Sequence, residues 1–235
     1  MTATKTGYHH GDLCAALIDA GLQLTRTGGP DALTIRAATR RAGVSPNAAY
    51  RHFADREALL TAVATAIHDK MAARMLKPVS RRGSAQTRAR DQLRAVGLGY
   101  IEFALNEPGW FTVAFFGGSA SLDAGEAKLG PPHKHRGSAS LDAGEAKLEP
   151  GSDLSAIGDD RVPPPLRALV DALDAMVEAG VLQPEQRAGA EWPCWSAVHG
   201  FAELALRGPL RGTSRGELDA LARRTVGDII SGLVR

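Results

Sequence analysis

The chain has few of the residues that point to a secreted, membrane-embedded or highly basic protein. Its only two cysteines in 235 residues, Cys14 and Cys194, lie far apart and show no metal-ligand spacing. A structural disulfide is therefore not expected, and a reduced cytoplasmic compartment is the simpler interpretation. The first residues lack the apolar stretch of a signal peptide, and no hydrophobic run is long enough to span a membrane. The formal net charge of +2 excludes a histone-like polycation but is compatible with a local contact to nucleic acid.

Sequence signatures of common enzymes are also absent. There is no glycine-rich phosphate loop followed by lysine, no nucleophile elbow and no helix with paired metal-binding histidines. Cys194 and His199 are five positions apart, so on a helix they project in different directions, and no third group follows to orient them. His133 and His135 stand in a segment with loop composition. We expect no enzyme, no metal site and no cofactor.

Helical hydrophobic periodicity dominates the chain and strand alternation is nearly absent, which predicts an all-α fold. An opening helix from residue 11 ends at residues 28–30, another follows residue 55, and further helices are expected at about 84–105, 166–180, 184–206 and 214–234. The segment 118–129 reads GSASLDAGEAKL and is repeated without change at 137–148. Two copies are too few for a solenoid, so we expect a flexible loop over 117–162 that contains a duplication.

The segment LTIRAATRRAGVSPNAAYRHFADREALL, residues 33–60, carries the most specific pattern in the chain. Thr34 is placed to cap a short helix, and Gly43 follows as a residue that adopts a left-handed turn without steric cost. Ser45 then caps a second helix, whose first turn holds Pro46 where the missing N–H does no harm. Two short helices joined by such a turn are typical of a helix-turn-helix, whose second helix enters the major groove of DNA.

The second short helix offers side chains suited to DNA. Asn47 can pair with an adenine edge, and Ala48 is small enough to contact a thymine methyl group. Tyr50, His52 and Arg56 are placed to bind phosphates and to fix the register of the helix on the duplex. The competing interpretation is a plain helical corner with a solvated basic face. Two further arginines complete the candidate set: Arg36 and Arg51.

Several pieces of this region occur together over about fifty residues. They are the opening helix GDLCAALIDAGLQLTRTGG, the turn Ala42-Gly43-Val44-Ser45, the motif Tyr50-x-His52-Phe53 and the helix start Arg56-Glu57-Ala58-Leu59-Leu60. In this combination the chain resembles the TetR family of transcriptional regulators. The resemblance implies a helix-turn-helix DNA-binding domain over residues 1–57 and a helical regulatory and dimerisation domain over residues 58–235.

The resemblance also assigns roles by position. The residues nearest the bases would be Arg36, Pro46, Asn47 and Ala48. The residues mainly at phosphates would be Thr34, Tyr50, His52 and Arg56. Arg56 stands where the family often has lysine, which keeps the charge, whereas alanines replace larger family residues at positions 48 and 49.

A second pattern lies near the C-terminus. Trp195-x-x-x-His199-Gly200 resembles the Trp-His-Gly motif of one C-terminal domain type found in TetR-like regulators. By this resemblance the last two helices pair with their copies in a second subunit as a four-helix bundle. Gly200 would then permit a close approach of helices.

The resemblance further implies a small-molecule effector bound among the helices of the second domain, as is usual for sites in helical bundles. Gly97 and Gly99 would leave room in the wall, and the scarcity of buried charge favours an apolar or weakly polar effector. The competing interpretation is that every candidate wall residue is core. The candidate walls are Tyr100, Phe103, Trp110, Phe111, Phe115, Trp195 and His199.

Three classes of function follow. The first is a dimeric repressor that binds a palindromic operator and is released by a small-molecule effector. The second is a DNA-binding regulator without small-molecule input, either an activator or a constitutive binder. The third is an interaction or architectural protein that merely shares the DNA-binding domain.

Overall fold

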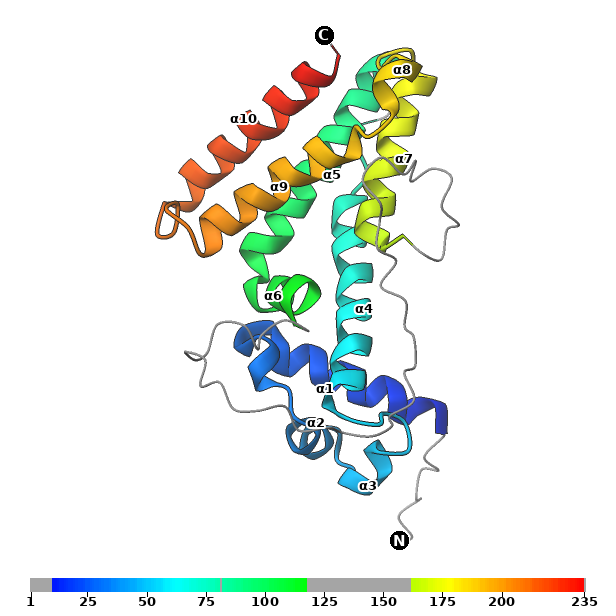
Figure 1. Cartoon of the computed structure of the whole chain (residues 1–235), viewed down its shortest axis with the longest axis vertical. Helices are drawn as coiled ribbons and strands as arrows, with labels where there is room; N and C mark the ends of the chain where they lie inside the picture. The colour runs from blue at the N-terminus through cyan, green and yellow to red at the C-terminus, as the bar shows by residue number, and fades with distance from the viewer. Residues whose placement is uncertain (1–9, 81, 118–161, 235) are drawn as a thin grey trace, which may run out of the picture.

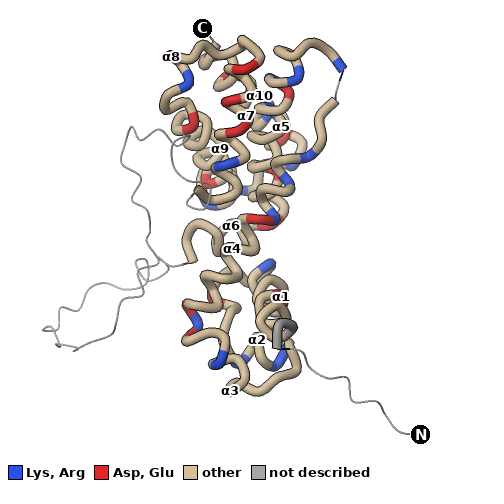
Figure 2. The backbone as a smooth tube through the Cα atoms, turned by 90° about the vertical axis from the view of Figure 1, so that its right-hand side faces the viewer, with Lys and Arg blue, Asp and Glu red and all other residues tan. Residues whose placement is uncertain are grey.

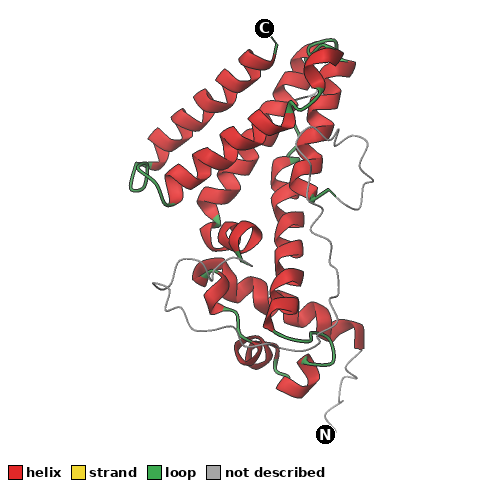
Figure 3. Cartoon of the chain, viewed as in Figure 1, coloured by secondary structure: helices red, strands yellow, loops and turns green. Residues whose placement is uncertain are grey.

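The structure is a computed structural model that describes residues 10–80, 82–117 and 162–234. Within these ranges the chain forms helices joined by loops and contains no strand, so the predicted all-α fold is confirmed (Figures 1 and 3). The predicted duplicated loop lies outside the described residues, apart from its two ends. The helices are α1 (His10–Gly28), η1 (Pro30–Ala32), α2 (Ile35–Ala42), α3 (Pro46–Ala49), α4 (Arg56–Met75), α5 (Ala85–Asn106), α6 (Pro108–Phe116), α7 (Pro164–Glu178), α8 (Pro184–Arg187), α9 (Glu191–Leu206) and α10 (Arg215–Leu233).

The helices α1, η1, α2 and α3 form one end of the molecule, which we call the head (Figure 1). Helix α1 turns Leu13 and Leu17 inward because apolar residues four apart share one helix face. These side chains belong to one buried cluster with Leu33, Ala38 and Phe53. Leu33 precedes α2, Ala38 lies in α2, and Phe53 follows α3. Helix α1 thus packs against the small helices of the head.

Helix α4 leads from the head into the second part of the molecule, which we call the body and which comprises α5 to α10 (Figure 1). Its start is fixed by Asp55, whose Oδ1 accepts a hydrogen bond of 2.8 Å from the backbone N–H of Ala58. Its inward face is fully buried at Leu59, Val63 and Met75. Helix α4 thus connects the two parts as one uninterrupted helix.

In the body, α5 lies at the centre and contacts α4, α7, α9 and α10. Helices α9 and α10 run side by side on one outer face, and α6 lies between α1 and the rest of the body (Figure 1). The helix boundaries agree with the sequence prediction to within a few residues, with two refinements. The predicted segment 184–206 forms two helices, α8 and α9, and the apolar stretch 110–116 belongs to a helix, α6.

Candidate functional site

The turn between α2 and α3 is built by local hydrogen bonds. Thr34 Oγ1 accepts from the backbone N–H of Ala37 at 3.0 Å, and Ser45 Oγ accepts from that of Ala48 at 3.3 Å. Gly43 adopts φ 70°, in the left-handed region that glycine favours. These contacts confirm the predicted helix-turn-helix geometry and place α3 at the far end of the head (Figure 1).

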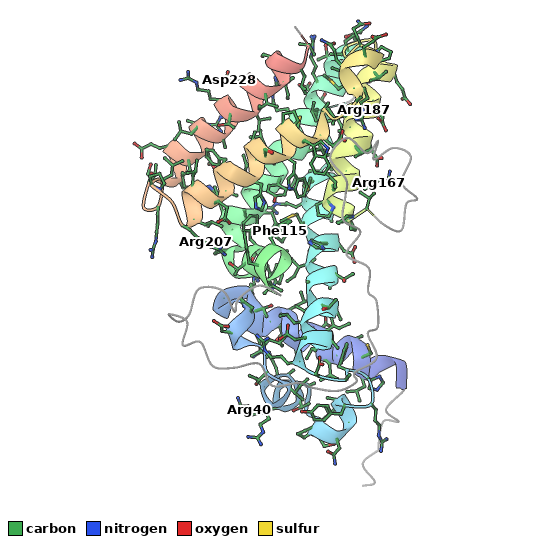
Figure 4. All side chains as sticks on the ribbon, in the orientation of Figure 1. Arg40, Phe115, Arg167, Arg187, Arg207 and Asp228 are labelled. Atoms are coloured by element: carbon green, nitrogen blue, oxygen red, sulfur yellow. The ribbon has the colours of Figure 1, made fainter. Side chains whose placement is uncertain are left out.

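The candidate DNA-contacting side chains lie on this end of the head. Seven are exposed and three are half-buried: exposed Thr34, Arg36, Ser45, Pro46, Asn47, Tyr50 and Arg51, and half-buried Ala48, His52 and Arg56. Tyr50 is 55% exposed, the highest value among the exposed large hydrophobic side chains of the described residues. Helices α2 and α3 carry three arginines and no acidic residue, and Arg40 extends away from the body (Figures 2 and 4). This surface can contact a polyanion without first breaking an ion pair.

Arg56 differs from the other candidates because its guanidinium is already engaged. Its Nε donates to the carbonyl of Leu33 at 2.7 Å, and its Nη2 donates to the carbonyl of Pro30 at 2.7 Å. Its Nη1 donates to Glu57. Arg56 therefore ties the start of α4 to the segment that leads into α2.

Helix α6 joins the head to the body. Trp110 Nε1 donates a hydrogen bond of 2.8 Å to the carbonyl of Leu22 in α1. Gly109 permits the close contact, because a Cβ there would lie 2.3 Å from the carbonyl oxygens of both Thr25 and Arg26. Arg26 in turn forms a two-pronged ion pair with Glu107 at 2.7 and 2.6 Å. The head is thus attached to the body through α6 as well as through α4.

An aromatic cluster fills the space between α4, α5, α6 and α9. The Tyr100 hydroxyl and His199 Nδ1 share a hydrogen bond of 2.7 Å. Phe115 points into this space from α6, with its ring centroid 5.0 Å from that of Phe111 and 5.1 Å from that of His199 (Figure 4). Trp195 lies edge-on to Tyr100 at 5.0 Å. Burial lowers the pKa of His199 and raises that of the Tyr100 hydroxyl, so both are neutral near pH 7.

A cavity of about 30 Å³ lies next to this cluster, between α5, α7, α9 and α10 and the end of α4. Space of that size holds a water molecule or a methyl group. Of the predicted wall residues, only Tyr100 and Trp195 line it. The other wall residues were not predicted from the sequence. They are mostly aliphatic and include Met75, Leu93, Val96, Leu169, Cys194, Val198, Val226 and Ile230.

The remaining predicted wall residues lie elsewhere. Phe111, Phe115 and His199 belong to the aromatic cluster, where they contact one another. Phe103 and Trp110 stack on each other at 6.2 Å and line a different cavity. The predicted wall residues therefore lie in three sites: the apolar cavity, the aromatic cluster and the cavity beside Phe103 and Trp110.

One glycine prediction was wrong. Gly99 does not leave room, because a Cβ there would lie 2.8 Å from Met75 Cα, and it instead permits the close crossing of α5 and α4. Gly200 has open space around it, since no described atom lies within 4 Å of an added Cβ, so a close approach of another helix there stays a prediction. Gly97 does line the cavity, with Val226 and Val198 opposite it.

Buried charge is also present where the sequence analysis expected little. Glu191 is 1% exposed and accepts a hydrogen bond of 2.8 Å from Arg187, which also binds Asp174 at 2.6 Å. The i, i+4 spacing of Arg187 and Glu191 was the signal for this pair. The neighbouring thiol of Cys194 is buried, which raises its pKa to about 11 and keeps it protonated.

Two further findings concern groups the sequence analysis considered. No cluster of three or more His, Cys, Asp or Glu side chains that could hold a metal occurs in the described ranges, and His133 and His135 lie outside them. None of the described helices has the length and apolarity needed to cross a membrane.

Two family profiles match the sequence of this chain. A sequence profile described as bacterial regulatory proteins of the tetR family matches residues 17–63, which contain most of the head and the start of α4. A second profile, described as the tetracyclin repressor-like C-terminal domain, matches residues 150–229. The chain belongs to the TetR family.

Solved structures share the fold. A protein of unknown function from Rhodococcus sp. RHA1 is 21% identical with a TM-score of 0.65, over 99% of this chain and 100% of the other. A TetR-family regulator from Streptomyces coelicolor is 19% identical with a TM-score of 0.58, over 98% and 89% of the two chains. FadR from Bacillus subtilis, solved with stearoyl-CoA, is 13% identical with a TM-score of 0.55, over 93% and 98%. No protein of curated function matches the sequence.

Membership of the TetR family makes this chain a transcriptional regulator with a helix-turn-helix head. The C-terminal profile carries a general description, so the resemblance of Trp195, His199 and Gly200 to the Trp-His-Gly type stays a prediction. In this family member, α9 and α10 present an outer face with two exposed leucines, Leu204 and Leu221.

Proposed function

We propose that this TetR-family protein is a dimeric repressor that binds a palindromic operator in the cytoplasm and is released from it by a small-molecule effector. The proposal of DNA binding rests mainly on how the structure exposes α3 and the residue that follows it. A helix that is capped by Ser45 and anchored by a buried Ala49 holds Asn47 and Tyr50 outward, on an arginine-rich surface. We take residues 1–57 as the DNA-binding unit and residues 58–235 as the regulatory and dimerisation unit.

The exposed side chains divide into two proposed roles. Asn47 and Arg36 carry donors that reach base edges, with Pro46 and Ala48 as small apolar contacts beside them. The hydroxyls and cations around them would bind phosphates: Thr34, Ser45, Tyr50, Arg51 and His52. For Arg56, the three protein oxygens around its guanidinium support a role in positioning this surface rather than a phosphate contact of its own.

The proposed dimer interface is the outer face of α9 and α10. Leu204 of α9 is 46% exposed, and Leu221 of α10 is 40% exposed. Gly200, one turn before Leu204, and Gly232, three turns after Leu221, have no described atom within 4 Å of an added Cβ. A face with exposed leucines and small residues fits a second copy of itself, as a two-fold axis requires. Two heads related in this way read half-sites one DNA turn apart, roughly 34 Å.

The proposed effector site is the apolar cavity between α5, α7, α9 and α10. Its wall includes Met75, the last residue of α4, and α5 crosses α4 closely at Gly99. Because the cavity holds about 30 Å³, an apolar effector must separate these helices to enter, and that separation would move α4 and the head. The Bacillus subtilis FadR structure, solved with stearoyl-CoA, supports a ligand-binding role for such a fold.

The small cavity also favours a second candidate, a regulator without small-molecule input. A space of about 30 Å³ gives no effector a preformed site, whereas ligand sites usually exceed roughly 300 Å³. The two candidates are separated by measuring operator affinity in a gel shift with a series of straight-chain alcohols up to 1-decanol. Release that strengthens with chain length supports the effector site, and unchanged affinity across the series supports the second candidate.

Operator selection from a random DNA pool tests DNA binding and dimerisation together. We expect the enriched sequences to be palindromic and to be protected in footprinting at moderate salt. The double variant Leu204→Glu/Leu221→Glu should sediment as a monomer and lose operator affinity by about 10²- to 10⁴-fold, because the two half-sites no longer bind as one unit. Leu76→Glu, at a leucine that is 52% exposed beyond the end of α4, is the matched control and should remain a dimer. Enrichment of no sequence would refute the proposed function.

A further inference from the structure

We infer that a second cavity, between α4, α5 and the start of α6, binds a small organic anion with a flat apolar body. The cavity holds about 270 Å³ and is lined by Lys70, Arg74, Phe103, Asn106, Glu107 and Trp110. It shares no residue with the apolar cavity of the proposed effector site. Lys70 and Arg74 are one turn apart on α4, so both cations face the same side.

Each side-chain acceptor oxygen of this cavity already accepts one hydrogen bond, so the lining polar groups without a partner are donors. Both carboxylate oxygens of Glu107 accept from Arg26, at 2.7 and 2.6 Å. The Oδ1 of Asn106 accepts from Arg215 Nη1 at 2.6 Å, which leaves its Nδ2 amide as the group still able to bond. A ligand that enters the cavity therefore meets N–H groups, and it must bring acceptors.

The cations in and next to the cavity outnumber the carboxylates that pair with them. Arg74 and Lys77 share one carboxylate, that of Glu102, at 2.6 and 3.2 Å. Lys70 has no carboxylate within ion-pair distance among the residues that the structure describes, and its Nζ lies 5.9 Å from the centre of the Trp110 ring. In addition, Arg74 Nε is buried and has no hydrogen-bond partner. Buried donors are normally paired, so an acceptor supplied by a ligand would complete this arrangement.

The apolar wall of the cavity favours a ligand that has a flat ring as well as a negative charge. The rings of Phe103 and Trp110 stack at 6.2 Å with an interplanar angle of 23°, which gives the cavity a flat aromatic side. A cavity that binds benzene measures about 150 Å³, so 270 Å³ accommodates one ring together with its charged group. A single-ring carboxylate satisfies the donors and the aromatic wall together, whereas an inorganic anion leaves the aromatic wall without a contact.

Benzoate, benzyl alcohol and sulfate are the three probes that test this inference on the full-length chain. The indole N–H signals of Trp110, Trp192 and Trp195 are followed by NMR and assigned with Trp192→Phe and Trp195→Phe, neither of which lines this cavity. We expect benzoate to shift the Trp110 signal saturably. The neutral alcohol and sulfate should bind at least about tenfold more weakly, since each lacks one of the two contacts.

The deciding variant is Lys70→Gln, which should weaken benzoate binding by about tenfold or more through the loss of a charged donor. Lys77→Gln is the matched control, because Lys77 is a nearby half-exposed cation that does not line the cavity. It should change the affinity less than about twofold. The inference is overturned if Lys70→Gln binds benzoate as the unmodified protein does, if benzyl alcohol or sulfate binds equally well, or if Trp195 responds without Trp110. None of these outcomes depends on operator binding or on the apolar cavity.

Discussion

The head and the body place their candidate functional side chains in opposite surroundings. In the head, Tyr50 and Asn47 are exposed, and the side chain of neither forms a hydrogen bond or ion pair with another described residue. In the body, Tyr100 and Phe111 have no exposed surface and contact each other in one cluster. Under the proposed function, the head can contact DNA as it stands, whereas the apolar cavity of about 30 Å³ must widen before it admits an effector.

The two regions also differ in the range of the interactions that hold them. The helix-turn-helix of the head depends on caps that span three residues, such as the cap from Thr34 to Ala37. The body depends on contacts such as that between Tyr100 and His199, which are 99 residues apart. Substitutions in the two regions should therefore separate binding from stability.

The largest expected effect is that of Phe111→Ala in the body. Phe111 is fully buried at the centre of the aromatic cluster, so the substitution should lower the free energy of unfolding by about 3–5 kcal/mol. Urea unfolding followed by circular dichroism measures this. A loss below about 1 kcal/mol would mean that the cluster is loosely packed and can already yield to a ligand.

The next effect concerns Arg56, which connects the head to α4. Arg56→Lys keeps the charge but cannot donate to the carbonyls of Leu33 and Pro30 at the same time. We expect a loss of about 1.5–3 kcal/mol in the free energy of unfolding, with operator affinity reduced alongside. Unchanged stability with reduced affinity would instead identify Arg56 as a phosphate contact.

Tyr50→Ala should have the reverse effect of Phe111→Ala. Since Tyr50 is 55% exposed, the melting temperature should stay the same, while operator affinity falls by about 10- to 100-fold through the loss of a phosphate contact. A gel shift with operator and with unrelated DNA measures the change, which should be similar for both. If affinity does not fall, the proposed docking of α3 is incorrect.

The smallest effect is the pH dependence contributed by His199. Burial lowers its pKa in the folded protein, so as the pH falls below about 6.5 the unfolded chain binds a proton that the folded chain does not. Stability is therefore lost on acidification, and His68, whose pKa burial also lowers, acts in the same direction. We expect His199→Gln to reduce the slope of melting temperature against pH between about 7.5 and 5.5. An unchanged slope would show that His199 does not report on the buried cluster.

The helices that the sequence predicted well are those with local signals. The helix α10 begins where Ser214 and Glu217 form a capping box, and α4 begins at the cap of Asp55. The helix α6 has no such signal, because its sequence from Pro108 to Phe116 is apolar on every side and shows no period. It forms a distinct element because it is enclosed between α1 and the body.

The candidate sites show the same division. The exposed residues of α3 could be predicted because a cap and a turn decide which way a four-residue helix faces. The cavity walls could not, because aliphatic residues such as Val96 and Ile230 look like ordinary core in the sequence. The second cavity could not be predicted either, since its lining combines Lys70 of α4, Asn106 of α5 and Trp110 of α6, which are distant in the sequence.

The sequence by itself determined the helical class, the family and which side chains the head exposes on the surface that we propose contacts DNA. Each of these rests on residues within a few positions of one another, where backbone geometry and capping act directly. Only the tertiary structure decided that Gly99 closes a helix crossing, that Phe103 and Trp110 leave the aromatic cluster, and where space remains between helices. Packing between distant segments fixes those features, because a cavity is the volume that side chains from several helices together fail to fill.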